Sequence, residues 1–197
     1  VYAEKIHSGM RDASETYNIP KVCGHTNIKT DRPQLAATIL GKANVLITSF
    51  DASPGQVLVV ISDQRGSYVG ESKNFASFFG VNPKRLQKDN EILPALAEKK
   101  LISSGKDISQ GGIIGTSIML AESSGVGIDI DPLALKCPDD NLEKWMTAFP
   151  SFGFLLSVNE ENLSEVLSAF QNRSIDARRV GRITEGTTVN LVENDNR

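Results

Sequence analysis

The turn at residues 107–112, Asp-Ile-Ser-Gln-Gly-Gly, holds the residue types that the sequence most clearly assigns to chemistry. Paired glycines let a backbone approach a ligand closely. The helix expected after the turn begins with unpaired N–H groups at the positive end of its dipole, where anions bind. Ser109, Gly111 and Gly112 are therefore candidate phosphate-binding residues. Asp107, at the end of a short strand, is a candidate ligand for a divalent cation that bridges phosphates.

The same turn also has a purely structural interpretation. It would be a plain tight turn in which Ser109 or Asp107 caps the following helix. Local physics weighs the two interpretations about evenly, since the sequence contains neither a Walker motif nor a dinucleotide fingerprint.

Residues 23–27, Cys-Gly-His-Thr-Asn, form a second candidate site. His25, Thr26 and Asn27 gather an imidazole, a hydroxyl and an amide in one compact turn. These groups could hydrogen-bond a phosphate or a substrate. A hydrogen-bonded loop between two elements explains the same spacing equally well.

Three further groups favour structural roles over chemistry. Asp129 and Asp131 lie on one face of a strand and could form a metal pair, but a solvated strand end is the favoured interpretation. Trp145 is expected in the core rather than in a base-stacking platform. The best basic patch is expected to be an exposed strand rim, and its residues are Arg178, Arg179 and Arg182.

Composition narrows the function classes. The chain has 197 residues, 40% of them hydrophobic, and a net charge of −3, so no broad attraction for nucleic acid or an anionic membrane is expected. Two cysteines and two histidines exclude a disulfide framework and a His-rich zinc site. Free thiols, no signal peptide and no apolar run of about 18 residues predict a cytoplasmic protein. The first residue is Val rather than Met, which suggests a processed or truncated product.

Hydrophobic spacing predicts the elements that must position these residues. An apolar stripe at 3-4-3-4 spacing over residues 3–17 predicts an amphipathic helix. The turn cluster at residues 51–55 is the best domain boundary, and the β-branched run after it predicts a buried strand at 57–61. Pro94 must kink or split a helix over 84–99. The other expected strands are 35–40, 43–50, 125–131, 152–158, 177–183 and 187–192, and the other helices are 113–122, 141–148 and one capped by Asn159. This order indicates a mixed α/β or α+β domain.

The order of these segments resembles the aminoimidazole ribonucleotide (AIR) synthase-like superfamily. That group includes AIR synthase, formylglycinamidine ribonucleotide amidotransferase, thiamine-monophosphate kinase, selenophosphate synthetase and a hydrogenase maturation dehydratase. Residues 23–26 look like its Gly-Gly-His-Thr turn, and residues 107–112 look like its Asp-Ile-Ser-Asp-Gly-Gly turn. Residues 125–131 and 181–183 are similar to its later strands. The strongest likeness is to the AIR synthase-related subgroup, for which no settled reaction is implied.

The resemblance covers nearly the whole chain and implies two parts. Residues 55–197 would be the C-terminal domain, a mixed α/β sandwich of the α+β class. Residues 1–54 would be the last helix and strands of a partial N-terminal α/β domain. That domain pairs its sheet with a second subunit in this family, which implies a homodimer with ATP near the interface. The implied cofactors are ATP and Mg, and the implied partner is a phosphorylated small molecule or nucleotide.

The sequence departs from the family pattern in three places. The early acidic segment that holds magnesium and the ATP phosphates is not in this sequence. Cys23 replaces the first glycine of its turn, and Gln110 replaces the usual Asp or Thr, which removes a possible metal ligand. The catalytic apparatus in this sequence is therefore incomplete by the family's pattern.

Two functions follow from the resemblance. The first is an ATP- and Mg-dependent enzyme, purine-biosynthesis-like or kinase-like, that activates an oxygen by phosphorylation so that a nucleophile displaces phosphate. The alternative is a non-catalytic dimeric module that binds a phosphorylated or nucleotide metabolite. An unrelated α/β domain would need several ordered coincidences. No residue is assigned as the general base, and the substrate is not assigned.

Overall fold

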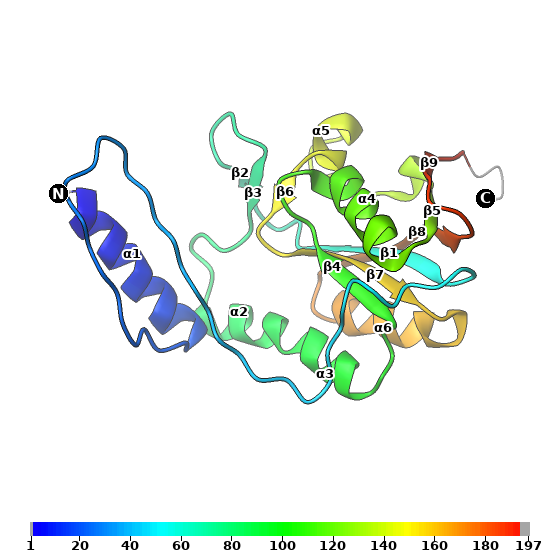
Figure 1. Cartoon of the computed structure of the whole chain (residues 1–197), viewed down its shortest axis with the longest axis horizontal. Coiled ribbons are helices and arrows are strands. Elements are labelled where there is room, and N and C mark those ends of the chain that lie inside the picture. The colour runs from blue at the N-terminus through cyan, green and yellow to red at the C-terminus, as the bar shows by residue number, and fades with distance from the viewer. Residues whose placement is uncertain (1, 194–197) are drawn as a thin grey trace.

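The computed structural model describes residues 2–193 and arranges most of them around one mixed sheet (Figure 1). Within this large sheet, neighbouring strands are antiparallel, except for the parallel pair β5–β9. In sheet order the strands are β4 (Ser104–Asp107), β7 (Gly153–Val158), β1 (Val57–Ser62), β8 (Asp176–Thr184), β5 (Gly127–Ile130) and β9 (Val189–Leu191). A smaller sheet contains β2 (Ser67–Tyr68), β3 (Asn74–Ala76) and β6 (Phe149–Pro150).

Helices cover both faces of the large sheet. One face carries α4 (Gly112–Ser124) and α5 (Leu142–Met146), with the short 3₁₀ turn η1 (Pro132–Ala134) nearby. The other face carries α3 (Ile92–Glu98) and α6 (Leu163–Gln171), which η2 (Glu160–Asn162) precedes. α2 (Pro83–Asn90) leads into α3, and α1 (Tyr2–Tyr17) contacts α2. The fold is therefore the mixed α/β sandwich that the sequence predicts.

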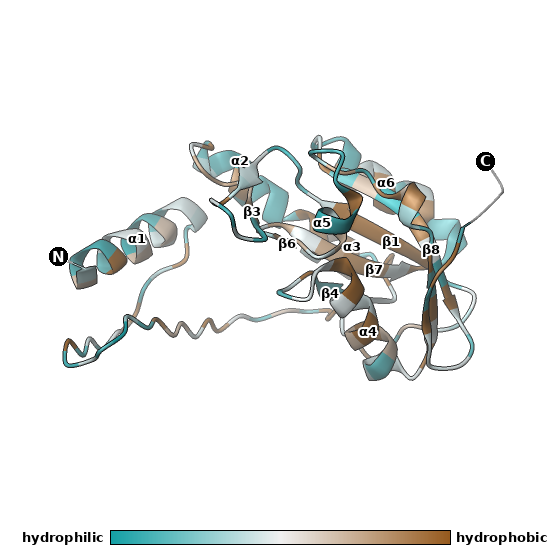
Figure 2. Ribbon diagram, turned by 90° about the horizontal axis from the view of Figure 1, so that it is seen from above, coloured by the Kyte–Doolittle hydropathy of each residue, from teal (hydrophilic) through white to brown (hydrophobic). Residues whose placement is uncertain are grey.

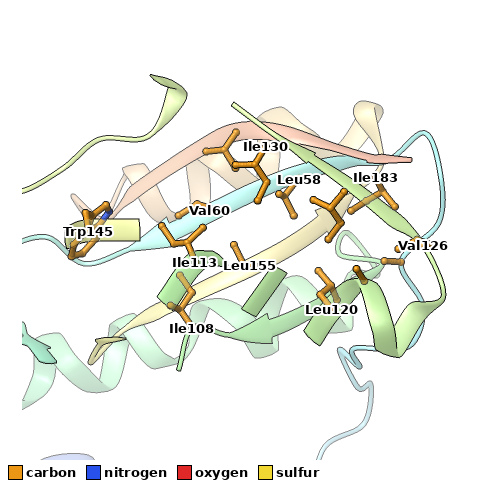
Figure 3. Close-up of a cluster of buried hydrophobic side chains, with 14 of the residues drawn as sticks. Leu58, Val60, Ile108, Ile113, Leu120, Val126, Ile130, Trp145, Leu155 and Ile183 are labelled. Carbon is orange, nitrogen blue, oxygen red and sulfur yellow. The ribbon is translucent and has the colours of Figure 1, made fainter. Parts of the chain in front are cut away.

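Strand β1 shows why the sheet is central. All six of its residues are buried, because alternate side chains enter different cores. Leu58 and Val60 pack under α4, whereas Val57, Val59 and Ile61 pack under α3 and α6. Figure 3 shows the first of these cores, with Leu58 and Val60 close to side chains of α4. Burying each such side chain contributes roughly 1.5–3 kcal/mol, so the β-branched run specifies a two-sided strand.

The predicted helix over residues 84–99 is split, as Pro94 requires, but the break lies at Glu91. Pro94 is then in the first turn of α3, where its missing N–H costs no intrahelical bond. The predicted cap at Asn159 is wrong. Its side chain makes no capping bond and instead accepts from Gln56 Nε2 at 3.0 Å, and the chain passes through η2 before α6 begins.

The strands predicted at residues 35–40 and 43–50 are wrong in this structure. Residues 18–44 contain no helix or strand and are all exposed. A strand needs a neighbour for its backbone groups, and near this region that neighbour is the free edge of β4. Only the end of the predicted strand 43–50 reaches the edge of β4, where Gly105 N–H donates to Thr48 C=O at 2.9 Å. Figure 2 shows much of the preceding stretch beside α1 and outside the sheet domain, with its last part running toward β4.

Helix α1 has the predicted extent but buries none of its residues. It meets the domain at its C-terminal end, where Gln87 Nε2 donates to Thr16 C=O at 2.8 Å. No helix among the described residues is long and apolar enough to cross a bilayer.

Candidate functional site

The turn at residues 107–112, called the glycine turn below, connects β4 to α4 as predicted, and Ile108 anchors it to the core. Ile108 is buried in the core, and its N–H donates to Gly153 C=O at 3.0 Å. Asp107 precedes this anchor, and its side chain is 65% exposed, with Lys106 Nζ 3.8 Å from Oδ1. The turn therefore presents a carboxylate to solvent from a fixed strand end.

Packing leaves no room for a side chain at Gly112. Its φ is +65°, a conformation that side chains rarely adopt, and a Cβ would lie 2.4 Å from Met146 C=O and 2.5 Å from Thr147 Cα. Its N–H donates to Ser109 C=O at 2.8 Å, which closes the turn. That N–H is thus used inside the turn here, and a phosphate role for Gly112 stays a prediction.

The remaining N–H donors of the turn are weakly bonded or unpaired within the described residues. Ser109 N–H makes a long 3.4 Å bond to Thr116 Oγ1. The N–H groups of Gln110 and Gly111, both exposed, have no protein acceptor within the part of the chain that the structure describes. Neither Ser109 nor Asp107 caps α4, because its N-cap is Gly111 and no side chain bonds there. The capping alternative is therefore wrong.

The structure does not bring the second predicted turn to the first. His25, Thr26 and Asn27 lie within the exposed stretch 18–44, and Asn27 Oδ1 accepts from Lys29 N–H at 2.9 Å. Figures 1 and 2 both show that stretch beside α1, away from the start of α4. Their role in ligand binding stays a prediction.

No group of three or more acidic, Cys or His side chains that could hold a metal occurs among residues 2–193. The favoured interpretation of Asp129 as part of a solvated strand end is wrong, because the residue is buried. Arg182 Nη2 lies 3.0 Å from its Oδ2, and Asn190 Nδ2 donates to Oδ1 at 3.0 Å. These contacts hold its pKa below the usual value, the Asn190 bond most strongly. Asp131 caps η1 through Leu133 N–H at 2.9 Å. A metal role for Asp107 therefore stays a prediction.

The three arginines proposed as a strand rim are ion-paired on exposed strand surface. Arg178 pairs with Asp176, Arg179 with Glu160, and Arg182 with Asp129. Trp145 lies in the core, as predicted.

The match to known proteins covers the domain that carries the glycine turn. A family model described as the C-terminal domain of AIR synthase related proteins matches residues 53–193. The chain belongs to the AIR synthase-related family. An uncharacterized protein of Synechocystis sp. is 39% identical over 196 residues, covering 96% of this chain and 59% of that relative. This chain therefore spans about three fifths of the length of that family member.

Other AIR synthase-related proteins are more distant. The phosphoribosylformylglycinamidine synthase subunit PurL of Carboxydothermus hydrogenoformans is 23% identical over 211 residues, covering 98% of this chain and 28% of that protein. The solved structure of PurL from Thermotoga maritima complexed with ATP has a TM-score of 0.62 at 15% identity, over 78% of this chain and 26% of that one. Thiamine-monophosphate kinase from Stenotrophomonas maltophilia has a TM-score of 0.51 at 12% identity, over 74% and 52%. These structures show the shared fold.

Sequence reasoning about this AIR synthase-related chain missed a charged cluster beside the end of β1. Asp63 and Asp89 are each only 3% exposed at the side chain. Arg65 Nε lies 2.7 Å from Asp63, Arg85 Nη2 2.9 Å from Asp63, and Arg173 Nη2 2.7 Å from Asp89. The cluster ties the loop after β1 to α2 and to the end of α6. Most of its members lie far apart in the sequence. The sequence signal for the cluster was therefore confined to Asp63 and Arg65, which directly follow a strand.

A second missed group is aromatic. Tyr68, Phe75 and Trp145 contact edge to face at 5.2 Å between successive ring centroids, and Lys144 Nζ lies 3.4 Å from the centre of the Tyr68 ring. Burial, with Asp139 and Cys137 nearby, raises the pKa of Tyr68 to about 12. Tyr68 lies in β2 opposite Phe75 of β3 and packs on its ring, so it is part of the small sheet.

Proposed function

We propose that this chain supplies the phosphate-binding half of an ATP- and Mg-dependent enzyme that activates an oxygen by phosphorylation. The observation that carries the proposal is the β4–α4 turn, where the Gln110 and Gly111 N–H groups are unpaired at the start of a 13-residue helix. A helix start of this kind stabilises a phosphate through backbone donors and the helix dipole. Family membership supports it, since matched proteins include PurL.

Nucleotide use is supported by related structures. Solved PurL structures with this fold are complexed with ATP, ADP and AMPPCP, and another is complexed with FGAR. On the proposed mechanism Asp107 helps hold Mg²⁺ against the phosphates, because carboxylate oxygens suit that ion. His25, Thr26 and Asn27 line the cleft between this domain and the rest of the enzyme. The protein acts as a cytoplasmic homodimer, and its ligand is a phosphorylated small molecule or nucleotide.

Calorimetry of the chain with Mg²⁺ and ATP tests the site. We expect measurable heat, and we expect Asp107→Asn to weaken binding because it removes the carboxylate charge from the metal. Glu161→Gln is the matched control, since Glu161 is an exposed carboxylate at η2. No heat with the unmutated chain, or equal loss in both variants, would contradict the proposal.

A backbone variant separates the turn from general effects of charge. Gly111 has φ −80°, which proline can adopt, so Gly111→Pro removes one N–H donor with its own φ unchanged. We expect weaker binding of inorganic phosphate. Gln110→Ala keeps its N–H and should bind phosphate as the unmutated chain does. Circular dichroism of both variants checks that the fold is retained.

The non-catalytic alternative is favoured by one specific feature, the exposed Gln110 at the position where the resembled family pattern has Asp or Thr, a possible metal ligand. It predicts that the chain binds a phosphorylated metabolite as a dimer without turning over ATP. Phosphate release from ATP that Asp107→Asn abolishes would exclude this alternative. Binding without any release would support it.

A further inference from the structure

An apolar groove lies between α4, α5 and the edge strand β9, outside the glycine turn. Its volume is about 820 Å³, within the range of ligand sites. Aliphatic side chains line most of it, and Ile118 and Leu191 are 43% and 58% exposed there. Apolar surface of this kind on a folded domain marks a contact site more often than scattered exposed residues do.

The wall of the groove at β9 is also an unpaired sheet edge. Thr188 C=O accepts from Ile128 N–H at 2.9 Å, and Val192 N–H donates to Ile130 C=O at 2.8 Å. Because backbone groups alternate along a strand, Val189 and Leu191 direct their N–H and C=O groups away from β5. In the described part of the chain no strand pairs with that side, and β9 ends the sheet order (Figure 1).

Side chains and backbone of β9 therefore offer complementary contacts to one kind of partner. The side chains of Val189 and Leu191 line the groove, while Asn190 lies on the other face and bonds Asp129. An added strand would fill the backbone hydrogen bonds of the edge and place every second side chain into the groove.

The charges at the groove favour extended partners with basic side chains over acidic ones. Glu122 and Glu143 line it, and no Lys or Arg does so among the described residues. Both glutamates are exposed at the rim. A partner with a basic residue flanking its apolar positions would meet these carboxylates, whereas an acidic partner would be repelled.

We propose that the β9 edge and its groove bind an extended peptide segment of a partner protein, added as a seventh strand. Alternate apolar side chains of the segment occupy the groove, and flanking basic side chains meet Glu122 and Glu143. This interaction does not use the N–H donors of the β4–α4 turn, and it assigns a protein-contact role to a surface that the proposed enzymatic function leaves unused.

A synthetic peptide provides the test. The probe alternates valine with threonine over six residues and carries lysine at each end, and its binding to the full chain is followed by NMR titration. We expect the resonances of Val189 and Leu191 to shift. Gly112 should shift as well, because Met146 and Thr147 line the groove and also pack on Gly112.

Two altered peptides separate strand addition from simple apolar contact. N-methylation of the amides that face β9 removes the donors but keeps the side chains, and we expect binding to weaken about tenfold because two hydrogen bonds are lost. Glutamate in place of the terminal lysines should also weaken binding, and the lysine preference should shrink as salt is added. Equal binding of the methylated peptide would overturn strand addition.

Protein variants localise the contact. Leu191→Asp places a charge in the groove, and we expect it to weaken peptide binding about tenfold or more, since an unpaired carboxylate there is costly. Leu46→Asp, also on an exposed leucine but outside the groove, is the matched control. No shift of β9 resonances at millimolar peptide would overturn the proposal. A dimer of the unmutated chain that Leu191→Asp separates would also overturn it, by assigning the groove to a second copy.

Discussion

The sheet domain and residues 18–44 place similar apolar side chains in opposite surroundings. Leu58 in β1 is fully buried between two helix layers, whereas Leu40 is 94% exposed. Both lie in runs whose composition favours a strand. The difference is that β1 has neighbours on both edges, β7 and β8, while residues 35–40 have none among the described residues. Strand-forming composition becomes a strand only where backbone and side chains find partners.

The two regions are joined by few contacts. At the end of the exposed segment, Asn44 Nδ2 donates to Glu98 Oε1 at 3.1 Å. Just beyond it, Thr48 C=O accepts from Gly105 N–H of β4. Inside the domain, by contrast, buried charges tie distant elements together. Four predictions, each with a pair of variants, test the interactions on the two sides of this difference.

The largest effect is expected from Asp89→Ala. It removes a carboxylate that pairs with Arg65, Arg85 and Arg173. Arg65 and Arg85 would keep Asp63, but Arg173 would lose the ion-pair partner that it has among the described residues. We expect the free energy of unfolding to fall by about 3–5 kcal/mol in urea denaturation. Asn44→Ala, which removes the link from the exposed segment, should change it by less than about 0.5 kcal/mol. Comparable losses would show that the segment is as firmly held as the domain.

A core leucine and an exposed leucine test the same contrast for packing. Leu58→Ala leaves a cavity between β1 and α4, and we expect a loss of about 2–5 kcal/mol. Leu40→Ala should stay within about 0.5 kcal/mol, since its side chain is already in water. Urea midpoints at a constant slope measure both. A large loss at Leu40 would mean that residues 35–40 are packed in solution, and the comparison would fail.

A substitution at Ser104 tests the contact between the sheet domain and the chain that leads into it. Its hydroxyl donates to Thr48 C=O at 2.6 Å from a fully buried position. We expect Ser104→Ala to cost about 1 kcal/mol and to speed chymotryptic cleavage at Phe50. Ser103→Ala, one residue away, should leave the cleavage rate unchanged. If both variants are cleaved alike, this hydrogen bond does not hold that contact.

The smallest effect concerns acid stability. Asn190 and Arg182 hold the pKa of Asp129 below its unfolded value. The stabilisation is therefore present above the unfolded pKa, near 3.9, and is lost as pH falls through the lower folded pKa. Asp129→Asn should make the urea midpoint less dependent on pH below about 4. Asn190→Ala should reduce the same dependence, and an unchanged acid profile in both variants would contradict the assignment.

Much of the domain and its turn follows from local sequence. The β-branched run at 57–61 predicts a two-sided strand because it lacks polar alternation. Gly111 and Gly112 predict a turn because glycine readily takes the positive φ that Gly112 adopts and other residues rarely do. The apolar residues of 113–122 predict a buried helix, but α4 is buried on one face only, and Ile118 on the other is 43% exposed. In each case residue types within a few positions predict the element, whereas its packing involves distant residues, such as Met146 and Thr147 against Gly112.

Only the tertiary structure decided the remaining features. Pro94 signalled a break, but the break came at Glu91 because proline is tolerated in a first turn. Residues 35–40 carried a strand pattern, yet pairing depends on a neighbour that sequence spacing does not provide. The partners of Asp63 and Asp89 lie up to 84 residues away, between Asp89 and Arg173. Local propensity thus determined which elements form in the domain, and contacts between distant residues decided which segments pair and which donors stay free at the turn.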